Sequence, residues 1–107
     1  MRVQLHKAAI VDLEAACDWC EAQREGLGHV LAGEIERALE AIADGLSMWP
    51  RWPGSPPEPL IRRCLLPRFP FALGYIAEPD RIVVLAVAHG KREPRYWERS
   101  LPTSSKP

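Results

Sequence analysis

The chain has 107 residues, of which 47% are hydrophobic and 26% charged, a composition typical of one globular domain. Its formal net charge is zero, which disfavours proteins that grip nucleic acid mainly through phosphates, because those gain affinity from each phosphate they neutralise. The longest apolar run, Ile82 to Ala88, is far shorter than the roughly 20 residues of a membrane-spanning helix, so no transmembrane segment is expected.

The first half of the chain predicts a short strand and two helices. Val3 and Leu5 alternate with polar residues, which indicates a strand over 2–5. A second pattern, with apolar residues three or four positions apart, predicts a helix from about Ala8 to Arg24 whose core-facing stripe is Ile10, Leu13, Cys17 and Cys20. A similar stripe predicts a helix from about Leu27 to Met48, and the glycine break between the two helices predicts an antiparallel hairpin.

The segment that follows, residues 49–59, contains five prolines and therefore excludes a helix or an inner strand. We interpret it as a stiff crossover from the helices to a sheet. A PxxP-type ligand for an SH3-like domain is the alternative interpretation.

The second half predicts an antiparallel meander over 60–66, 71–77 and 82–88. The last of these is continuously apolar, which is typical of a central strand covered on both faces. We therefore expect a single α+β domain over residues 1–101, in which a two-helix antiparallel hairpin packs on a four-stranded, mostly antiparallel sheet in the order β-α-α-β-β-β. Residues 102–107 are expected to form a disordered tail.

The pair Cys17 and Cys20 has the C-x-x-C spacing of redox and zinc sites. A thioredoxin-like pair needs its first thiol at a helix N-terminus, and zinc needs four ligands, whereas these cysteines fall in mid-helix and the other candidate ligands are scattered. We therefore expect both thiols to be buried and reduced, with no metal and no cofactor. The odd number of cysteines and the lack of an apolar secretory signal at the start predict a cytoplasmic protein.

The residues from His89 onward combine a base that titrates near neutral pH with cations and aromatic rings. The cations and rings of this stretch are Lys91, Arg92, Arg95, Tyr96, Trp97 and Arg99. Such residues hold nucleotides by stacking and phosphate contact, but they are equally the residues of protein-binding hot spots. Composition leaves both interpretations open.

From about Val3 to Arg99 the chain resembles toxins of the RelE/ParE superfamily, which belong to type II toxin–antitoxin pairs. The resemblance rests on short pieces in a fixed order: Ala9-Ile10-Val11-Asp12-Leu13, Gly26-Leu27-Gly28, Arg62-Arg63, Arg68-Phe69-Pro70-Phe71, Gly74-Tyr75, Val84 to His89, Arg92, Pro94, Tyr96-Trp97 and Arg99. It implies a cytoplasmic bacterial growth inhibitor, neutralised by a cognate antitoxin protein that wraps it. The acidic residues of the helices are expected to attract basic antitoxin side chains, since residues 1–59 carry ten acidic and five basic side chains.

The superfamily divides by mechanism. ParE-like toxins block DNA gyrase by binding it, and the neutral net charge together with the lack of a cation in Phe71–Tyr75 favours that class. We then expect the target to be bound by Lys91, Arg92, Arg95, Tyr96, Trp97 and Arg99, with no membrane and no small-molecule substrate involved.

The alternative is a RelE-like endonuclease that cuts messenger RNA on the ribosome. It would use His89 as the general base, Arg63 and Arg92 to stabilise charge on the scissile phosphate, and Tyr96 as a stacking group or acid.

Overall fold

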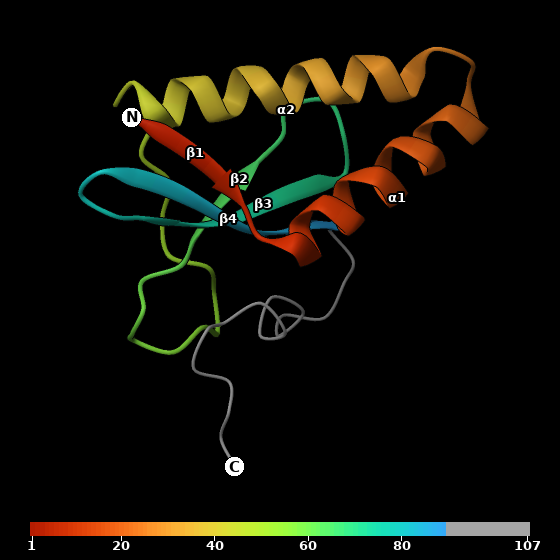
Figure 1. Cartoon of the computed structure of the whole chain (residues 1–107). Helices are drawn as coiled ribbons and strands as arrows, with labels where there is room; N and C mark the ends of the chain where they lie inside the picture. Colours follow the sequence, from red (N-terminus) through yellow and green to blue (C-terminus); the bar gives the residue numbers. More distant parts are fainter. Residues whose placement is uncertain (90–107) are drawn as a thin grey trace.

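A computed structural model gives the structure of the protein and describes residues 1–89. Two helices and four strands follow one another in the expected β-α-α-β-β-β order (Figure 1): β1 (Arg2–Leu5), α1 (Lys7–Gln23), α2 (Leu27–Ala43), β2 (Arg62–Leu65), β3 (Phe71–Ala77) and β4 (Arg81–His89). The predicted α+β class is therefore confirmed. The predicted domain end at residue 101 and the predicted tail at 102–107 lie outside the described residues.

The four strands form one mixed sheet in the order β1-β4-β3-β2. β1 pairs with β4 in parallel, and the other two pairs are antiparallel. β4 is thus an inner strand, as its continuous apolar sequence predicts. An irregularity in the β3–β4 pairing places Gly74 opposite Ala86 and Tyr75 opposite Val84, so that Leu85 is an extra residue in β4.

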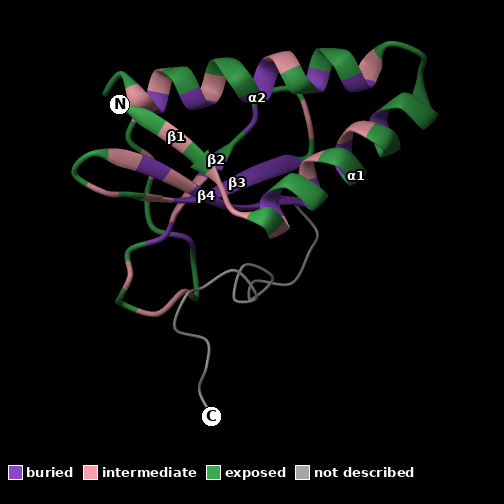
Figure 2. Ribbon diagram, in the orientation of Figure 1, coloured by how far each residue is buried: buried purple, intermediate pink, exposed green. Residues whose placement is uncertain are grey.

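The helical hairpin covers one face of this sheet (Figures 1 and 2). The larger core cluster lies there, with Leu31 and Ile35 of α2 packed in the same cluster as Leu73 and Tyr75 of β3. No helix within residues 1–89 has the length and hydropathy that a membrane crossing would require.

A second, smaller core cluster belongs to the opposite face and is built around Trp52. This tryptophan comes from the proline-rich segment, which connects α2 to β2 as expected and also pairs with the sheet edge: the Trp52 N–H donates to the Ile61 carbonyl at 2.7 Å. Gly74 lies beneath the indole, where a Cβ atom would come within 3.1 Å of the ring. The proline-rich segment therefore covers part of the sheet that the helices leave open.

The predicted end of the second helix is wrong, because α2 stops at Ala43 rather than near Met48. Gly45 adopts a left-handed conformation with φ of 77°. The N–H groups of Gly45 and Leu46 donate to the carbonyls of Ile42 and Ala41, which is the Schellman arrangement that terminates many helices.

The predicted apolar stripe of the first helix is confirmed in part, because Cys20 is buried and Leu13 and Cys17 pack against the core, but it is wrong at Ile10. The side of α1 that is buried consists of Ala9, Asp12, Ala16 and Cys20, whereas Ile10 is 45% exposed. The burial expected for Cys20 is confirmed, but Cys17 is only half-buried. All three cysteines are free thiols. Two small alanines bring the helix close to the sheet, and this close contact outweighs the larger apolar area of Ile10.

Asp12 is the polar member of that buried stripe. Its Oδ2 accepts a hydrogen bond of 3.0 Å from the Val87 N–H of β4. Only 8% of the Asp12 surface is exposed to solvent. A buried donor that loses its acceptor costs more free energy than an ordinary hydrogen bond contributes.

We expect Asp12→Ala to lower the free energy of unfolding by about 1–3 kcal/mol, because the Val87 N–H would lose this acceptor. Asp12→Asn, which keeps an acceptor oxygen, should cost less, and Asp18→Ala on the exposed side of the same helix should change stability by less than about 0.5 kcal/mol. Urea denaturation of the three variants measures these differences. Equal losses for Asp12→Ala and Asp18→Ala would contradict the role of the buried carboxylate.

The hairpin depends on a close approach of its two helices at Gly28. A Cβ atom on Gly28 would lie 2.7 Å from the Cys17 carbonyl oxygen and 3.0 Å from Oε1 of Glu21. A Cβ atom on Gly33, five residues further along α2, would have its nearest neighbour at 3.5 Å, and that neighbour is the end of the flexible Arg37 side chain. The two glycines thus occupy different environments in the same helix.

The matched pair Gly28→Ala and Gly33→Ala should therefore change stability in opposite directions. Gly28→Ala should destabilise the protein by about 1–3 kcal/mol through overpacking against the α1 backbone. Gly33→Ala should stabilise it by about 0.5–1 kcal/mol, because alanine favours the helix. Thermal or urea unfolding checks both, and a stabilising Gly28→Ala would show that the helices are not in close contact there.

Candidate functional site

His89, the base of the nuclease hypothesis, lies at the end of β4 and belongs to a cluster of three rings. Its imidazole centroid is 5.7 Å from the Trp19 ring of α1 and 5.3 Å from the Phe71 ring of β3, and Trp19 and Phe71 are 5.9 Å apart. All three pairs are edge-to-face, the geometry in which aromatic rings attract one another. We call these residues the aromatic cluster; it lies on the helix-covered side of the sheet, where Phe71 belongs to the larger core.

Arg63, the second predicted catalytic residue, lies on the other face. Its Cζ is 5.7 Å from the ring centroid of Trp52, a cation–π distance. Arg63 pairs with Gly74 and Gly74 with Ala86, three residues before His89 in β4. At the usual spacings, Arg63 is offset from His89 by about 10 Å across the strands and about 10 Å along them. The structure does not bring Arg63 and His89 together.

The other predicted site residues, Lys91, Arg92, Arg95, Tyr96, Trp97 and Arg99, lie outside the described residues. Among residues 1–89, no group of three or more His, Cys, Asp or Glu side chains is placed to hold a metal ion.

The pKa values of the two thiols in the C-x-x-C pair are those expected of packed side chains and not of reactive cysteines. Burial, followed by the nearby Asp18 carboxylate, raises the pKa of Cys17 above its ordinary value, and burial raises the pKa of Cys20. Burial also raises the pKa of Cys64 to about 11. A reactive cysteine needs a lowered pKa, so these thiols are protonated and poorly nucleophilic at neutral pH.

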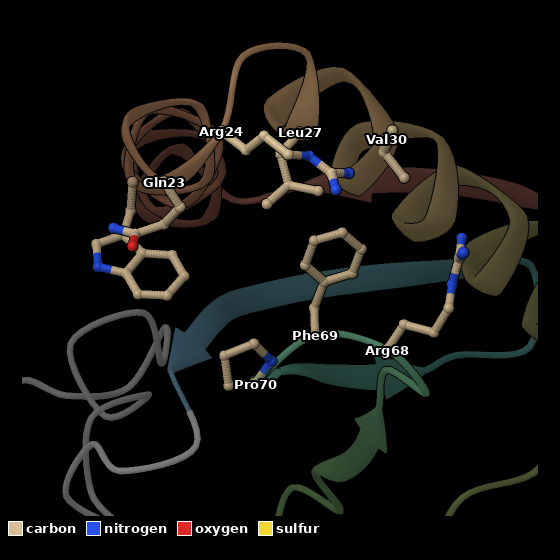
Figure 3. A pocket seen from close by; sticks show the side chains of 8 residues that line it. Gln23, Arg24, Leu27, Val30, Arg68, Phe69 and Pro70 are labelled. Carbon is tan, nitrogen blue, oxygen red and sulfur yellow. The ribbon is translucent and has the colours of Figure 1, made fainter.

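A cleft of about 340 Å³ lies where the connected ends of the two helices meet the β2–β3 loop (Figure 3). Its lining residues are Trp19, Gln23, Arg24, Leu27, Val30, Arg68, Phe69 and Pro70. Figure 3 shows the Phe69 ring between the Pro70 and Arg68 side chains, facing Leu27 and Arg24 of the hairpin. Trp19 belongs both to this lining and to the aromatic cluster, so the two features are contiguous. We call this feature the hairpin cleft.

One side of the hairpin cleft is fixed by a buried carboxylate. Glu34 of α2 is 5% exposed and accepts two hydrogen bonds from Arg68, from the side-chain Nε at 3.0 Å and from the backbone N–H at 3.2 Å. The guanidinium is itself largely exposed. Glu34 therefore anchors the β2–β3 loop on α2 and holds Arg68 in one orientation, with its charge still accessible to solvent.

The other side of the hairpin cleft is shaped by the helix connection. The Glu21 carboxylate accepts hydrogen bonds from the N–H groups of Gly26 at 2.8 Å and Gly28 at 3.0 Å. These donors belong to the start of α2, where backbone N–H groups have no partner within the helix and a negative charge is favourable. The same bonds, with that of Gly26 the stronger, hold the pKa of Glu21 below its ordinary value.

The lowered pKa of Glu21 predicts a specific contribution to acid stability. The stabilisation is fully present above the ordinary glutamate pKa of about 4.3 and is lost as the pH falls through the lower folded-state value. Glu21→Gln should thus flatten the acid limb of the stability curve, measured as the urea midpoint between pH 7 and pH 3. The matched exposed variant Glu14→Gln should leave that limb unchanged, and an identical effect of the two variants would contradict the role of Glu21 as a cap.

Sequence reasoning did not find the hairpin cleft. Arg68, Phe69 and Pro70 entered only as a piece of the superfamily resemblance, and Glu34 resembles an ordinary surface residue of a helix. The only available signal was a loop, 67–70, in which an aromatic residue and a cation stand between two prolines.

A comparison with solved structures finds the same fold. The chain is similar to a chain of the "Chromosomal ParDE TA system from P. aeruginosa", with a TM-score of 0.66 and 18% sequence identity, over 83% of this chain and 95% of the other. A scan against protein-family models finds no match, and neither does a search of curated proteins. The likeness confirms the fold that the resemblance to the RelE/ParE superfamily implies.

Proposed function

We propose that this protein is the toxin of a type II toxin–antitoxin pair, that it acts in the cytoplasm by binding and poisoning DNA gyrase, and that a cognate antitoxin neutralises it. The observation that carries the proposal is the fold likeness to a chain of a ParDE system, which extends over 95% of that chain. The sequence pieces of the superfamily resemblance support it independently of the fold comparison.

The separation of Arg63 from His89 supports binding over cleavage. A general base and a group that stabilises charge on a phosphate must reach the same scissile bond, each within hydrogen-bond distance. Here the two side chains are on opposite faces of the sheet, and each is engaged in packing with a tryptophan. A nuclease would therefore have to work without one member of the predicted set.

The target-binding residues belong, in this proposal, to the segment that follows β4. Lys91, Arg92, Arg95, Tyr96, Trp97 and Arg99 supply the residue types that dominate binding hot spots. This segment directly follows β4 in sequence, and β4 is an inner strand of the sheet, which favours a binding role because functional side chains are best placed next to rigid elements.

The purified protein should inhibit DNA supercoiling by gyrase and should leave translation and messenger RNA intact. The triple variant Arg92→Ala, Trp97→Ala, Arg99→Ala should lose at least 100-fold in inhibitory potency, in line with the loss of two or more hot-spot residues at about 2 kcal/mol each. The matched variant Arg37→Ala, Leu46→Ala, which changes exposed residues of the helical region, should keep the wild-type potency.

Supercoiling assays and ribosome-programmed primer extension, run on the same preparations, separate the mechanisms. Messenger RNA cleavage without gyrase inhibition would contradict the gyrase proposal and favour the nuclease. Full potency of the triple variant would remove the 91–99 segment from the mechanism.

A further inference from the structure

We infer that the hairpin cleft is an anchor site for one apolar side chain of the antitoxin that is accompanied by a carboxylate. The inference rests on the function proposed above and adds the chemistry of the contact. The cleft is the meeting point of three parts of the chain, namely the end of α1, the start of α2 and the β2–β3 loop.

The apolar part of the site is exposed in the structure. Trp19 is 45% and Val30 37% exposed, and with Leu27, Phe69 and Pro70 they line a single concave surface. Apolar side chains gathered in a cleft attract an apolar partner group, because its burial removes both surfaces from water. A cleft of about 340 Å³ has room for a large apolar side chain and part of its neighbours.

The charged part of the site favours an acidic residue beside the apolar side chain of the antitoxin. Arg24 makes no ion pair within the described residues, and Arg68 uses its Nε and backbone N–H for Glu34, which leaves its terminal nitrogens available. A guanidinium held in a fixed orientation is a preferred partner for a carboxylate and loses little conformational freedom on binding.

The two arginines of the cleft are surrounded by exposed acidic residues on the rest of the hairpin. The exposed acidic residues of the hairpin are Glu14, Asp18, Glu21, Glu25, Glu36, Glu40 and Asp44. A basic antitoxin segment is attracted by these residues along most of the hairpin but meets two arginines at the cleft. The lining of the cleft holds two arginines and no carboxylate, so the register that places an apolar residue and an adjacent Asp or Glu there is favoured over registers that place basic side chains against Arg24 and Arg68.

The test uses the full-length protein and the product of the neighbouring reading frame, with the dissociation constant measured by fluorescence anisotropy at 0.15 M salt. Arg24→Glu should weaken binding at least tenfold. The matched reversal Arg37→Glu, which lies on α2 outside the cleft, should change binding less than threefold. Val30→Asp and the matched Ala32→Asp form a second pair, in which only the cleft variant should weaken binding tenfold or more.

A benzophenone photo-crosslinker at Gln23 then identifies the occupant in the complex. The expected crosslink is to an antitoxin residue within four positions of an apolar residue that has Asp or Glu beside it. A crosslink to an antitoxin stretch in which no apolar residue has Asp or Glu beside it, or to a second copy of this chain, would overturn the inference, as would equal effects within both variant pairs. In these cases the proposed function stands, because the wild-type protein still binds; a wild-type protein that does not bind contradicts both.

Discussion

The hydrogen bond between the Val87 N–H and the Asp12 carboxylate determines how α1 is rotated on the sheet, and the exposed features of the molecule depend on that rotation. Because the acceptor is buried, rotation of the helix would leave a backbone donor of the inner strand without this partner. Trp19 lies seven positions after Asp12, on the same side of the helix. It therefore reaches Phe71 and His89 and also forms one wall of the hairpin cleft.

The second constraint is the covering of the inner strands from two sides. The helices cover one face, and Trp52 of the proline-rich segment covers part of the other. Arg63 stacks on Trp52, whereas His89 packs beside Trp19, so each residue is held on its own face by a different tryptophan. On the described part of the chain, Arg63 thus borders the Trp52 ring, and Arg24 and Arg68 border the apolar lining of the hairpin cleft. Aromatic and apolar groups with arginines beside them are typical of binding surfaces.

Much of the fold could be predicted because hydropathy periodicity and turn residues report local structure directly. The order of the elements follows from the periodicity along the chain, and the inner position of β4 follows from its uninterrupted apolar run. The exposure of Ile10 could not be predicted this way, because hydropathy favours Ile10 over Ala9 and Asp12 as a core residue, whereas in the structure Ile10 is 45% exposed and the other two are buried. The end of α2 at Ala43 can be predicted from Gly45 just beyond it, but the apolar residues Leu46 and Met48 favour a longer helix.

The site was harder to predict than the fold, because its parts meet only in three dimensions. Glu34 and Arg68 are 34 positions apart, and their ion pair depends on how the β2–β3 loop returns to α2. Trp52 stands in a proline-rich segment whose sequence indicates a connection and gives no sign of a second core. His89 can be singled out from the sequence as a base at the end of an apolar strand, but its ring neighbours Trp19 and Phe71 cannot be read from the sequence.

The proposal that this protein acts by binding and not by cleavage is tested most directly by the variant His89→Phe. Phenylalanine keeps a ring between Trp19 and Phe71 but cannot act as a base. Growth inhibition on expression without the antitoxin should remain within about threefold of wild type, with normal antitoxin binding as the control for folding. A folded, antitoxin-binding His89→Phe protein that no longer inhibits growth would contradict the binding mechanism and favour catalysis by the imidazole.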